Sequence, residues 1–416
     1  MPSVLEIRWI MRPASLLVVV AAACVGEPDS SPWSVADSAG VRVVEIAVEP
    51  VALPVYASVG ELEFTVGSID GTDGPAFGDV GEVRSLPGGD VLVTESRSQT
   101  VGVYDRSGRT LARMGGRGDG PGEFRFLHVA GVAGDTLWIW DPIPQRLTPL
   151  SRSGRVWPVV TFEHELADRP GDLRRLADGG FVARTRFQPL DPLDPKYAES
   201  KVWTDSLVLR RLDAEGLEID TIAIAAAEQL LREIWPSPTG EGDGRPVGAM
   251  LPFGTQAHWA IDSIGNSVVV DGTSGQMVLR DVRGSIRTVV RFASPPRPLP
   301  EAEVERLRRS RLDDVESSPF RPMVERVFSK ELLPTAFPRV GGLLVGESGT
   351  IWVAQYATFP EEVTEWTAFA PDGEPLGRLS LPARFQAREF GEAYVLGAHT
   401  DEFGVQRVQR YRLERP

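Results

Sequence analysis

Residues 86–111, "LPGGDVLVTESRSQTVGVYDRSGRTL", contain two short apolar strands framed by glycine turns. The first turn centres on Gly89, and Val91 and Val93 then fall on one face of the strand that follows. A second turn, of the form Asp/Ser-x-x-Gly, ends at Gly108. This unit of turn, strand, link, strand and turn is the pattern on which the fold prediction depends.

The unit recurs along the whole chain. Five copies keep both turns, and a sixth near the C-terminus keeps the strands but loses the second turn. The first-turn glycines are Gly89, Gly134, Gly179, Gly265, Gly349 and Gly391. A spacing of about 40 to 45 residues is typical of one four-stranded propeller blade, and we interpret the two doubled intervals as insertions. We therefore predict an all-β, six-bladed β-propeller with a helical insertion at about residues 298–332, between blades four and five.

Residues 116–124, "GRGDGPGEF", could be a phosphate loop, an Arg-Gly-Asp adhesion site or a turn. A phosphate loop needs Gly-Lys-Ser/Thr or a glycine pattern that opens a helix, whereas Glu123 and Phe124 follow here without a helix signal. The upstream copy "GTDGPAF" at 71–77 keeps Asp-Gly-Pro and the phenylalanine but lacks Arg-Gly-Asp. We interpret the repeated element as a structural turn that crosses from one blade to the next.

The segment "LEFTVG" at 62–67 has the pattern of an outer strand but precedes the first blade. The last repeat lacks its second turn, so its sheet needs another strand. We predict that this N-terminal strand closes the last blade, because a propeller cannot leave an open sheet edge exposed.

The N-terminus has the features of an export signal. Arg8 and Arg12 precede the apolar run "SLLVVVAAA", which is too short to span a bilayer and leads into Cys24, the only cysteine. The stretch "AAAC" is similar to a bacterial lipobox, in which the cysteine is lipidated. We predict a lipoprotein signal peptide at 1–23, a lipidated tether at 24–40 and a single propeller domain at 41–416. An ordinary cleaved leader with an incidental cysteine is the alternative.

The formal net charge is −14 at pH 7. A strongly acidic surface repels phosphate backbones, so we do not expect nucleic acid as a partner. Anionic lipid headgroups are disfavoured for the same reason, so any membrane attachment must be covalent or through a hydrophobic element. The predicted location is the bacterial cell envelope, on the periplasmic or cell-surface side.

These patterns resemble those of the six-bladed, NHL-like β-propeller lipoproteins of bacteria. The resemblance rests on "GDGPGEF" at 118–124 and on "LPTAFPRVGGLLVGESGTIWV" at 333–353. It implies the propeller fold and a lipid-anchored location outside the cytoplasm. Members of this group mostly lack an assigned activity, so the resemblance implies no catalytic residues.

Known catalytic motifs are mostly incomplete. "HELAD" at 164–168 begins like a zinc protease motif but has Asp168 in place of the second histidine, and no Gly-x-Ser-x-Gly occurs. Ligands of propellers sit where the innermost strands meet at the central channel. The residues about seven positions before each turn glycine form one predicted ring: Glu82, His128, Asp172, His258, Gly342 and Arg384.

Two functions remain open from the sequence. We expect a non-catalytic binding module for a protein, peptide or saccharide partner. The alternative is a metal-dependent hydrolase or lyase, lactonase-like, in which His128, His258, Glu82 and Asp172 hold a divalent metal such as Zn or Ca. The ring could also be a water-filled polar channel. The helical insertion could cap one face of the propeller or dock a partner.

Overall fold

Strands predominate in this computed structural model, which describes residues 31–69, 71, 74–162, 171–186, 201–235, 245–254, 256–359 and 362–416. Cys24 and the "HELAD" segment lie outside the described residues. Within the described part of the chain, neither helix is long and apolar enough to cross a membrane.

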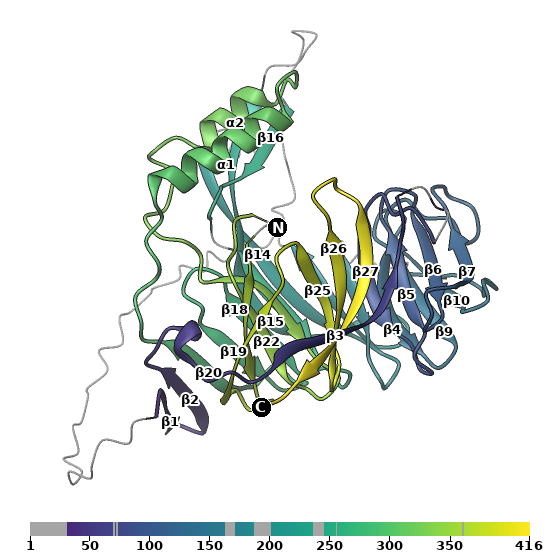
Figure 1. Cartoon of the computed structure of the whole chain (residues 1–416), viewed down its shortest axis with the longest axis horizontal. Helices are drawn as coiled ribbons and strands as arrows, with labels where there is room; N and C mark the ends of the chain where they lie inside the picture. Colours follow the sequence, from purple (N-terminus) through teal and green to yellow (C-terminus); the bar gives the residue numbers. More distant parts are fainter. Residues whose placement is uncertain are drawn as a thin grey trace, which may run out of the picture. The chain divides into compact units, whose positions relative to one another are not determined.

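Six sheets are described, each with a meander of antiparallel strands (Figure 1). The first two sheets comprise β4 (Val80–Ser85), β5 (Val91–Glu95), β6 (Thr100–Tyr104) and β7 (Thr110–Gly115), then β8 (His128–Ala133), β9 (Thr136–Asp141), β10 (Arg146–Ser151) and β11 (Val160–Thr161). The third comprises β12 (Asp172–Arg175), β13 (Phe181–Arg186), β14 (Lys201–Leu212), β15 (Glu218–Trp235) and β16 (Arg245–Met250).

The fourth sheet comprises β17 (Ala257–Ile261), β18 (Ser267–Asp271), β19 (Met277–Arg280) and β20 (Ile286–Phe292), extended by β2 (Val41–Ile46) and β1 (Trp33–Ser38). The fifth comprises β21 (Val340–Val345), β22 (Ile351–Gln355), β23 (Thr364–Phe369) and β24 (Pro375–Leu381). The sixth comprises β25 (Phe385–Phe390), β26 (Tyr394–Thr400), β27 (Gln406–Glu414) and β3 (Ser58–Val66). A short 3₁₀ turn covers Pro50–Ala52.

The core consists of apolar clusters between successive sheets. Alternation along each strand sends one set of side chains toward each neighbouring sheet. The following buried pairs each share a cluster, in order from the first and second sheets round to the sixth and first: Leu92 and Ile139, Trp140 and Leu173, Leu209 and Val269, Val270 and Val353, Trp352 and Phe390, Leu396 and Val93. The last sheet therefore packs on the first, and the described residues form a β-propeller.

The predicted closing strand is confirmed. β3 pairs antiparallel with β27, with Phe64 opposite Arg410 and Val66 opposite Val408 (Figure 1). Phe64 and Val66 are both buried in the cluster between the sixth and first sheets. Strands from the two ends of the propeller thus share one sheet, which pairs the edge that β27 would otherwise expose.

The segment 116–124 is a crossing turn, as predicted. It connects β7 of the first sheet to β8 of the second, and the Phe124 N–H donates to the Gly116 carbonyl at 2.8 Å. Asp119 accepts two hydrogen bonds from the Arg125 guanidinium, at 2.6 and 2.7 Å. Gly122 has φ of 77°, in the left-handed region that favours glycine. Phe124 is fully buried between the two sheets, so the stretch has a structural role.

The prediction for the tether was wrong in part. Residues Trp33–Ser38, assigned from the sequence to the tether at 24–40, form strand β1, and any tether ends before Trp33. β1 pairs antiparallel with β2, which pairs parallel with β20 at the outer edge of the fourth sheet. Most side chains of β1 are exposed, including that of Val35, so pairing with β2 rather than burial stabilises this strand.

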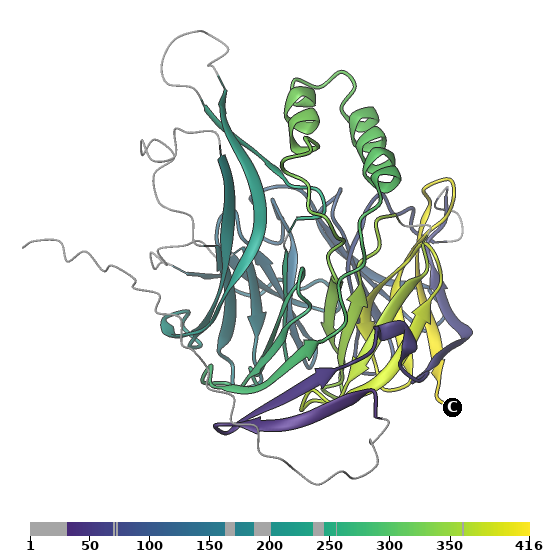
Figure 2. The ribbon, with the colours of Figure 1, turned by 90° about the vertical axis from the view of Figure 1, so that its left-hand side faces the viewer.

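The extended strands of the third sheet and the helical segment after β20 are two insertions that pack together beside the sheets (Figure 2). β15 runs for 18 residues and pairs with β14 on one side and β16 on the other. The helices α1 (Glu301–Asp314) and α2 (Arg321–Val327) follow β20 and precede β21. Buried side chains from both insertions form one cluster: Leu231, Val247, Val304, Met323 and Val327. The helices are therefore packed on the extended strands of the third sheet.

Candidate functional site

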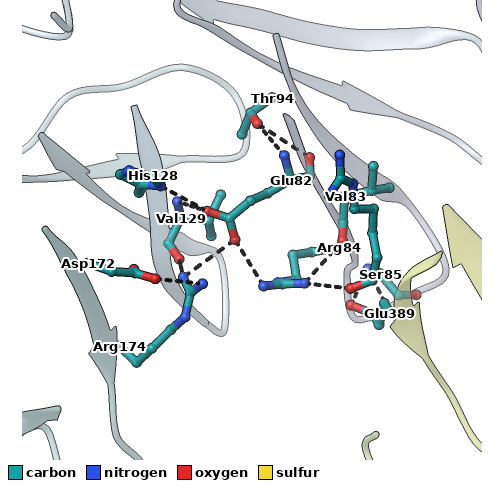
Figure 3. Close-up of polar contacts among 11 residues, drawn as sticks. Glu82, Val83, Arg84, Ser85, Thr94, His128, Val129, Asp172, Arg174 and Glu389 are labelled. Carbon is teal, nitrogen blue, oxygen red and sulfur yellow. Dashed lines mark hydrogen bonds and ion pairs between the residues drawn. The ribbon is translucent and has the colours of Figure 1, made fainter. Parts of the chain in front are cut away.

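Three of the predicted ring residues meet in one polar network on the innermost strands (Figure 3). Glu82 on β4 is at its centre. Its carboxylate accepts hydrogen bonds from the Val129 N–H at 2.9 Å and from Arg84 at 2.9 Å. His128 Nδ1 lies 3.7 Å from the same carboxylate. The network therefore joins the inner strands of the first and second sheets.

Arg174 extends the network to the third sheet. Its guanidinium lies 3.4 Å from Glu82 and 3.3 Å from Asp172, and it also donates to the Val129 carbonyl. The predicted residues Glu82 and Asp172 thus flank a cation that the sequence prediction missed, and His128 contacts the Glu82 carboxylate. Arg174 follows Asp172 by two positions on β12, so strand alternation could have placed both side chains on one face.

The charges of this network are strongly coupled. Burial by itself would raise the pKa of Glu82, but the Arg174 charge, the hydrogen bond with His128 and the Arg84 charge together hold that pKa far below the usual range. Burial lowers the pKa of Arg174, whereas Asp172 and Glu82 raise it, with a net increase. Glu82 is therefore a permanent anion at neutral pH, which suits a hydrogen-bond acceptor better than a general acid.

The sixth sheet joins the same network through its inner strand β25. Arg84 donates to the Arg388 carbonyl at 3.1 Å, and the Ser85 N–H donates to the Glu389 carboxylate at 3.0 Å. Burial raises the pKa of Glu389, although Arg84 and the Tyr394 hydroxyl act in the other direction. These contacts tie the inner strands together at the point where the ring closes.

The other ring positions, His258, Gly342 and Arg384, line a separate cavity of about 570 Å³. It lies at the start of the inner strands β17, β21 and β25. Further lining residues come from those strands, from β23 and from the loop after β22: Gln256, Gln355, Tyr356, Phe359, Trp366, Phe385, Gln386 and Arg388. The sequence prediction found three positions of this cavity but not the loop residues, which have no repeat pattern.

Strand β17 supplies one titratable side chain to the cavity wall, that of His258. Its Nε2 lies 3.2 Å from the Val340 carbonyl oxygen on the neighbouring strand β21. Burial lowers the pKa of His258, and the hydrogen bond to the carbonyl only partly opposes this. The ring is therefore neutral at pH 7 and donates to Val340.

The rim of the cavity contacts the inserted substructure. The ring of Tyr356 packs against Phe253 and Phe337, with centroids 6.2 Å away in both cases. Arg306 on α1 lies over the Phe359 ring, 3.5 Å from its centroid. The helices thus hold the loop that forms one side of the cavity, and a change in their position would alter the rim.

The four predicted metal candidates are not gathered at one point. Glu82 and Asp172 flank Arg174 and His128 contacts Glu82, whereas His258 lines the cavity. Within the described ranges, no group of three or more histidine, cysteine, aspartate or glutamate side chains is arranged to hold a metal ion. The two carboxylates that a metal would need, those of Glu82 and Asp172, are instead both ion-paired with the Arg174 guanidinium.

No family model and no curated protein sequence matches this chain. Among solved structures, a putative exported protein from Bacteroides fragilis is 12% identical with a TM-score of 0.45, over 90% of this chain and 99% of that one. The PQQ-bound aldose sugar dehydrogenase from Streptomyces coelicolor is 15% identical with a TM-score of 0.41, over 87% and 100%. The calcium-binding protein regucalcin from Agrobacterium tumefaciens is 12% identical with a TM-score of 0.39, over 86% and 96%. Likenesses this distant carry no argument about the function of this chain.

Proposed function

We propose that this chain is a six-bladed β-propeller, lipid-anchored at Cys24 outside the cytoplasm, that binds a saccharide, peptide or protein ligand without catalysis. The observation that carries the proposal is the cavity lined by His258, Gly342 and Arg384. Its volume of about 570 Å³ lies within the range of about 300–1,000 Å³ that is usual for ligand pockets. Aromatic, amide and cationic side chains line it together, as in sites that bind organic ligands.

The polar network around Glu82 supports binding rather than catalysis. Its carboxylate is engaged by Arg84, Arg174 and the Val129 N–H. A carboxylate that acts as a general acid or base needs a pKa near the working pH, and the pKa of Glu82 is shifted in the opposite direction. We therefore assign the network to the stability of the ring and the cavity to the ligand.

The proposed location rests on the N-terminal sequence. The short apolar run ends in Ala-Ala-Ala-Cys, and the cysteine is the only one in the chain. A lipid on Cys24 would keep the propeller at the membrane while residues before Trp33 act as a tether. Ligands of such a protein are cell-envelope or extracellular molecules.

The test is a binding screen with a variant that fills the cavity. The detergent-purified full-length protein is applied to arrays of neutral and acidic oligosaccharides and of peptides, beside the Gly342→Leu variant. A Cβ at Gly342 would lie 3.4 Å from the Ala354 Cβ and 3.7 Å from the Trp366 ring, without a backbone clash. We expect the substitution to lower affinity at least about tenfold, because leucine occupies ligand volume.

Gly248→Leu is the matched control. Gly248 lies on β16 away from the cavity lining, and its added Cβ would meet only the Leu231 carbonyl oxygen, at 3.7 Å. This variant should bind as the unsubstituted protein does. An array on which no probe binds, or equal binding by the Gly342→Leu variant, would contradict the proposal.

A further inference from the structure

The charged groups of the cavity wall all have one sign. Arg384 and Arg388 line it, and the described lining residues include neither aspartate nor glutamate. This composition contrasts with the whole chain, in which 58 acidic residues outnumber 44 basic ones. Two cations gathered in a cavity of an acidic protein indicate that the cavity is built for negative charge.

Arg388 on β25 is half-buried and has no carboxylate within ion-pair distance in the described structure. Its Nη2 donates only a long hydrogen bond, 3.4 Å, to the Val80 carbonyl, and its Nε is buried without a hydrogen-bond partner. Burial lowers its pKa, although Glu82 raises it and Arg84 adds to the lowering. A guanidinium held in this way is costly, and an anion in the cavity would offset that cost.

Arg384 precedes β25 and has an unusual backbone conformation. Its φ is 63°, in the left-handed region where residues other than glycine are uncommon. Its carbonyl accepts from the Thr400 N–H at 3.0 Å, and its Nη1 makes only a 3.5 Å contact with the Asp401 carbonyl. Strain of this kind, about 1–3 kcal/mol per residue, concentrates at binding sites. The guanidinium thus remains available at the cavity wall.

The neutral part of the lining suits a ligand with many hydroxyl groups. Three glutamine side chains and three threonine hydroxyls, each able to donate and accept, come from different elements: Gln256, Gln355, Gln386, Thr358, Thr364 and Thr400. Tyr356 and Trp366 add aromatic rings. The negative face of such a ring attracts the polarised C–H groups of a sugar. A peptide that binds by adding a strand to an exposed sheet edge would not need such a cavity.

We infer that the cavity between β17, β21 and β25 binds an acidic saccharide, with the ligand carboxylate held by Arg388 and Arg384. The inference rests on the proposed binding function and names the ligand class for the same site. Guanidinium and carboxylate form the strongest neutral-pH pairing available to these side chains. The neutral glutamine and threonine groups then orient the sugar ring.

The preference for an acidic ligand depends on the charges close to the cavity rather than on the negative net charge of the protein. Charges farther than about 8 Å are largely screened at physiological ionic strength, so the net charge of −14 weakens encounter more than it weakens the bound state. Added salt should therefore change the affinity for an acidic sugar less than it changes binding to an exposed basic patch.

The test compares two probes that share one disaccharide, of which the second carries a methyl ester in place of each carboxylate charge. Binding of digalacturonic acid and of its dimethyl ester to the full-length protein is measured by titration calorimetry at neutral pH. We expect the acid to bind at least about tenfold more tightly than the ester, as the loss of a charge-assisted hydrogen bond implies. A tetraglutamate peptide tests whether charge alone is sufficient, and it should bind more weakly than the acid.

Two substitutions assign the preference to the arginines. Arg388→Gln and Arg384→Gln should each lower affinity for the acid about tenfold and leave the ester nearly unchanged. Glutamine can adopt the left-handed backbone conformation of position 384, since Gln99 and Gln145 have φ of 58° and 54° in the same protein. Arg106→Gln, at an exposed turn, is the control for the change in net charge.

The possible results distinguish a failure of the acidic-saccharide inference from a failure of the proposed binding function. Equal affinity for acid and ester, binding that both arginine substitutions leave intact, or tighter binding of tetraglutamate would overturn the acidic-saccharide assignment. If neutral sugars or peptides still bind and Gly342→Leu still abolishes that binding, the proposed function stands without it. If the whole array is negative, both fail.

Discussion

Replacing Glu82 with glutamine tests whether the charge at the centre of the polar network stabilises the propeller. The amide keeps an oxygen that accepts from the Val129 N–H, but it removes the negative charge facing Arg84 and Arg174. Breaking a fully buried ion pair costs about 3–5 kcal/mol, and Glu82 and its two arginines are only partly buried. Asp172, 3.3 Å from Arg174, still neutralises that guanidinium, so we expect a loss of about 2–3 kcal/mol.

This loss corresponds to a small shift of the unfolding temperature. The entropy of unfolding is about 2.1 cal/mol/K per residue, so a unit spanning Pro32–Pro416 should lose about 3 °C in Tm. Thermal unfolding followed by far-UV circular dichroism on the purified full-length protein measures it. Glu63→Gln is the control, because Glu63 pairs with Arg412 at 2.8 Å on the surface, where a pair is worth less than about 1 kcal/mol.

The effect of Glu82→Gln also depends on pH. In the unfolded chain Glu82 takes up a proton near its ordinary pKa of 4.5, whereas in the folded chain it stays charged. Its contribution is therefore complete above about pH 5 and falls by up to about 1.4 kcal/mol for each pH unit below 4.5. The difference in Tm between the two proteins should narrow as the pH falls from about 5 to about 3. A Glu82→Gln protein that melts within about 1 °C of the Glu63→Gln control at neutral pH would refute a stabilising role.

Three further predictions concern the anchor, the glycine positions and the metal content. Cys24→Ser should move the protein from the membrane fraction to the soluble fraction, and retention at the membrane would rule out a lipid anchor at this position. Gly377→Ala should destabilise by several kcal/mol, because the added Cβ would lie 2.4 Å from the Pro54 carbonyl oxygen; Gly404→Ala, with φ of 81° but open space, should cost only about 1 kcal/mol in the same unfolding assay. Elemental analysis of protein dialysed against metal-free buffer should find much less than one equivalent of Zn, Ca or Mn, and near-stoichiometric metal would favour the hydrolase or lyase alternative.

The sheets could be predicted because their signals are local. Turn glycines such as Gly108, with φ of 81°, and alternating apolar residues such as Val91 and Val93 act within a few positions of the chain. Strand β1 was not predicted, because most of its side chains are exposed. The extension of β15 was not predicted, because its segment "AAEQLLRE" is rich in residues that favour helices. Pairing of this segment with β14 and β16 overrides that preference.

The candidate site could be predicted only in part. Counting back from the turn glycines found a position on five inner strands and one, Arg384, just before the sixth. Three of these, Glu82, His128 and Asp172, do belong to a common network. Counting along the sequence could not show that these positions divide into a polar network and a cavity. That division depends on which side chains of different sheets approach each other.

By itself the sequence determined the repeated sheets, the crossing turns and the strand that closes the ring, since each depends on short-range turn chemistry and strand periodicity. Only the tertiary structure decided that Arg174 lies between Glu82 and Asp172, and that Arg384 and Arg388 share a cavity with His258. Glu82 is far from Asp172 in the chain, as His258 is from Arg384, and the distances between such residues follow from the packing of whole sheets. The cavity rim likewise exists only because two distant insertions bury one apolar cluster together.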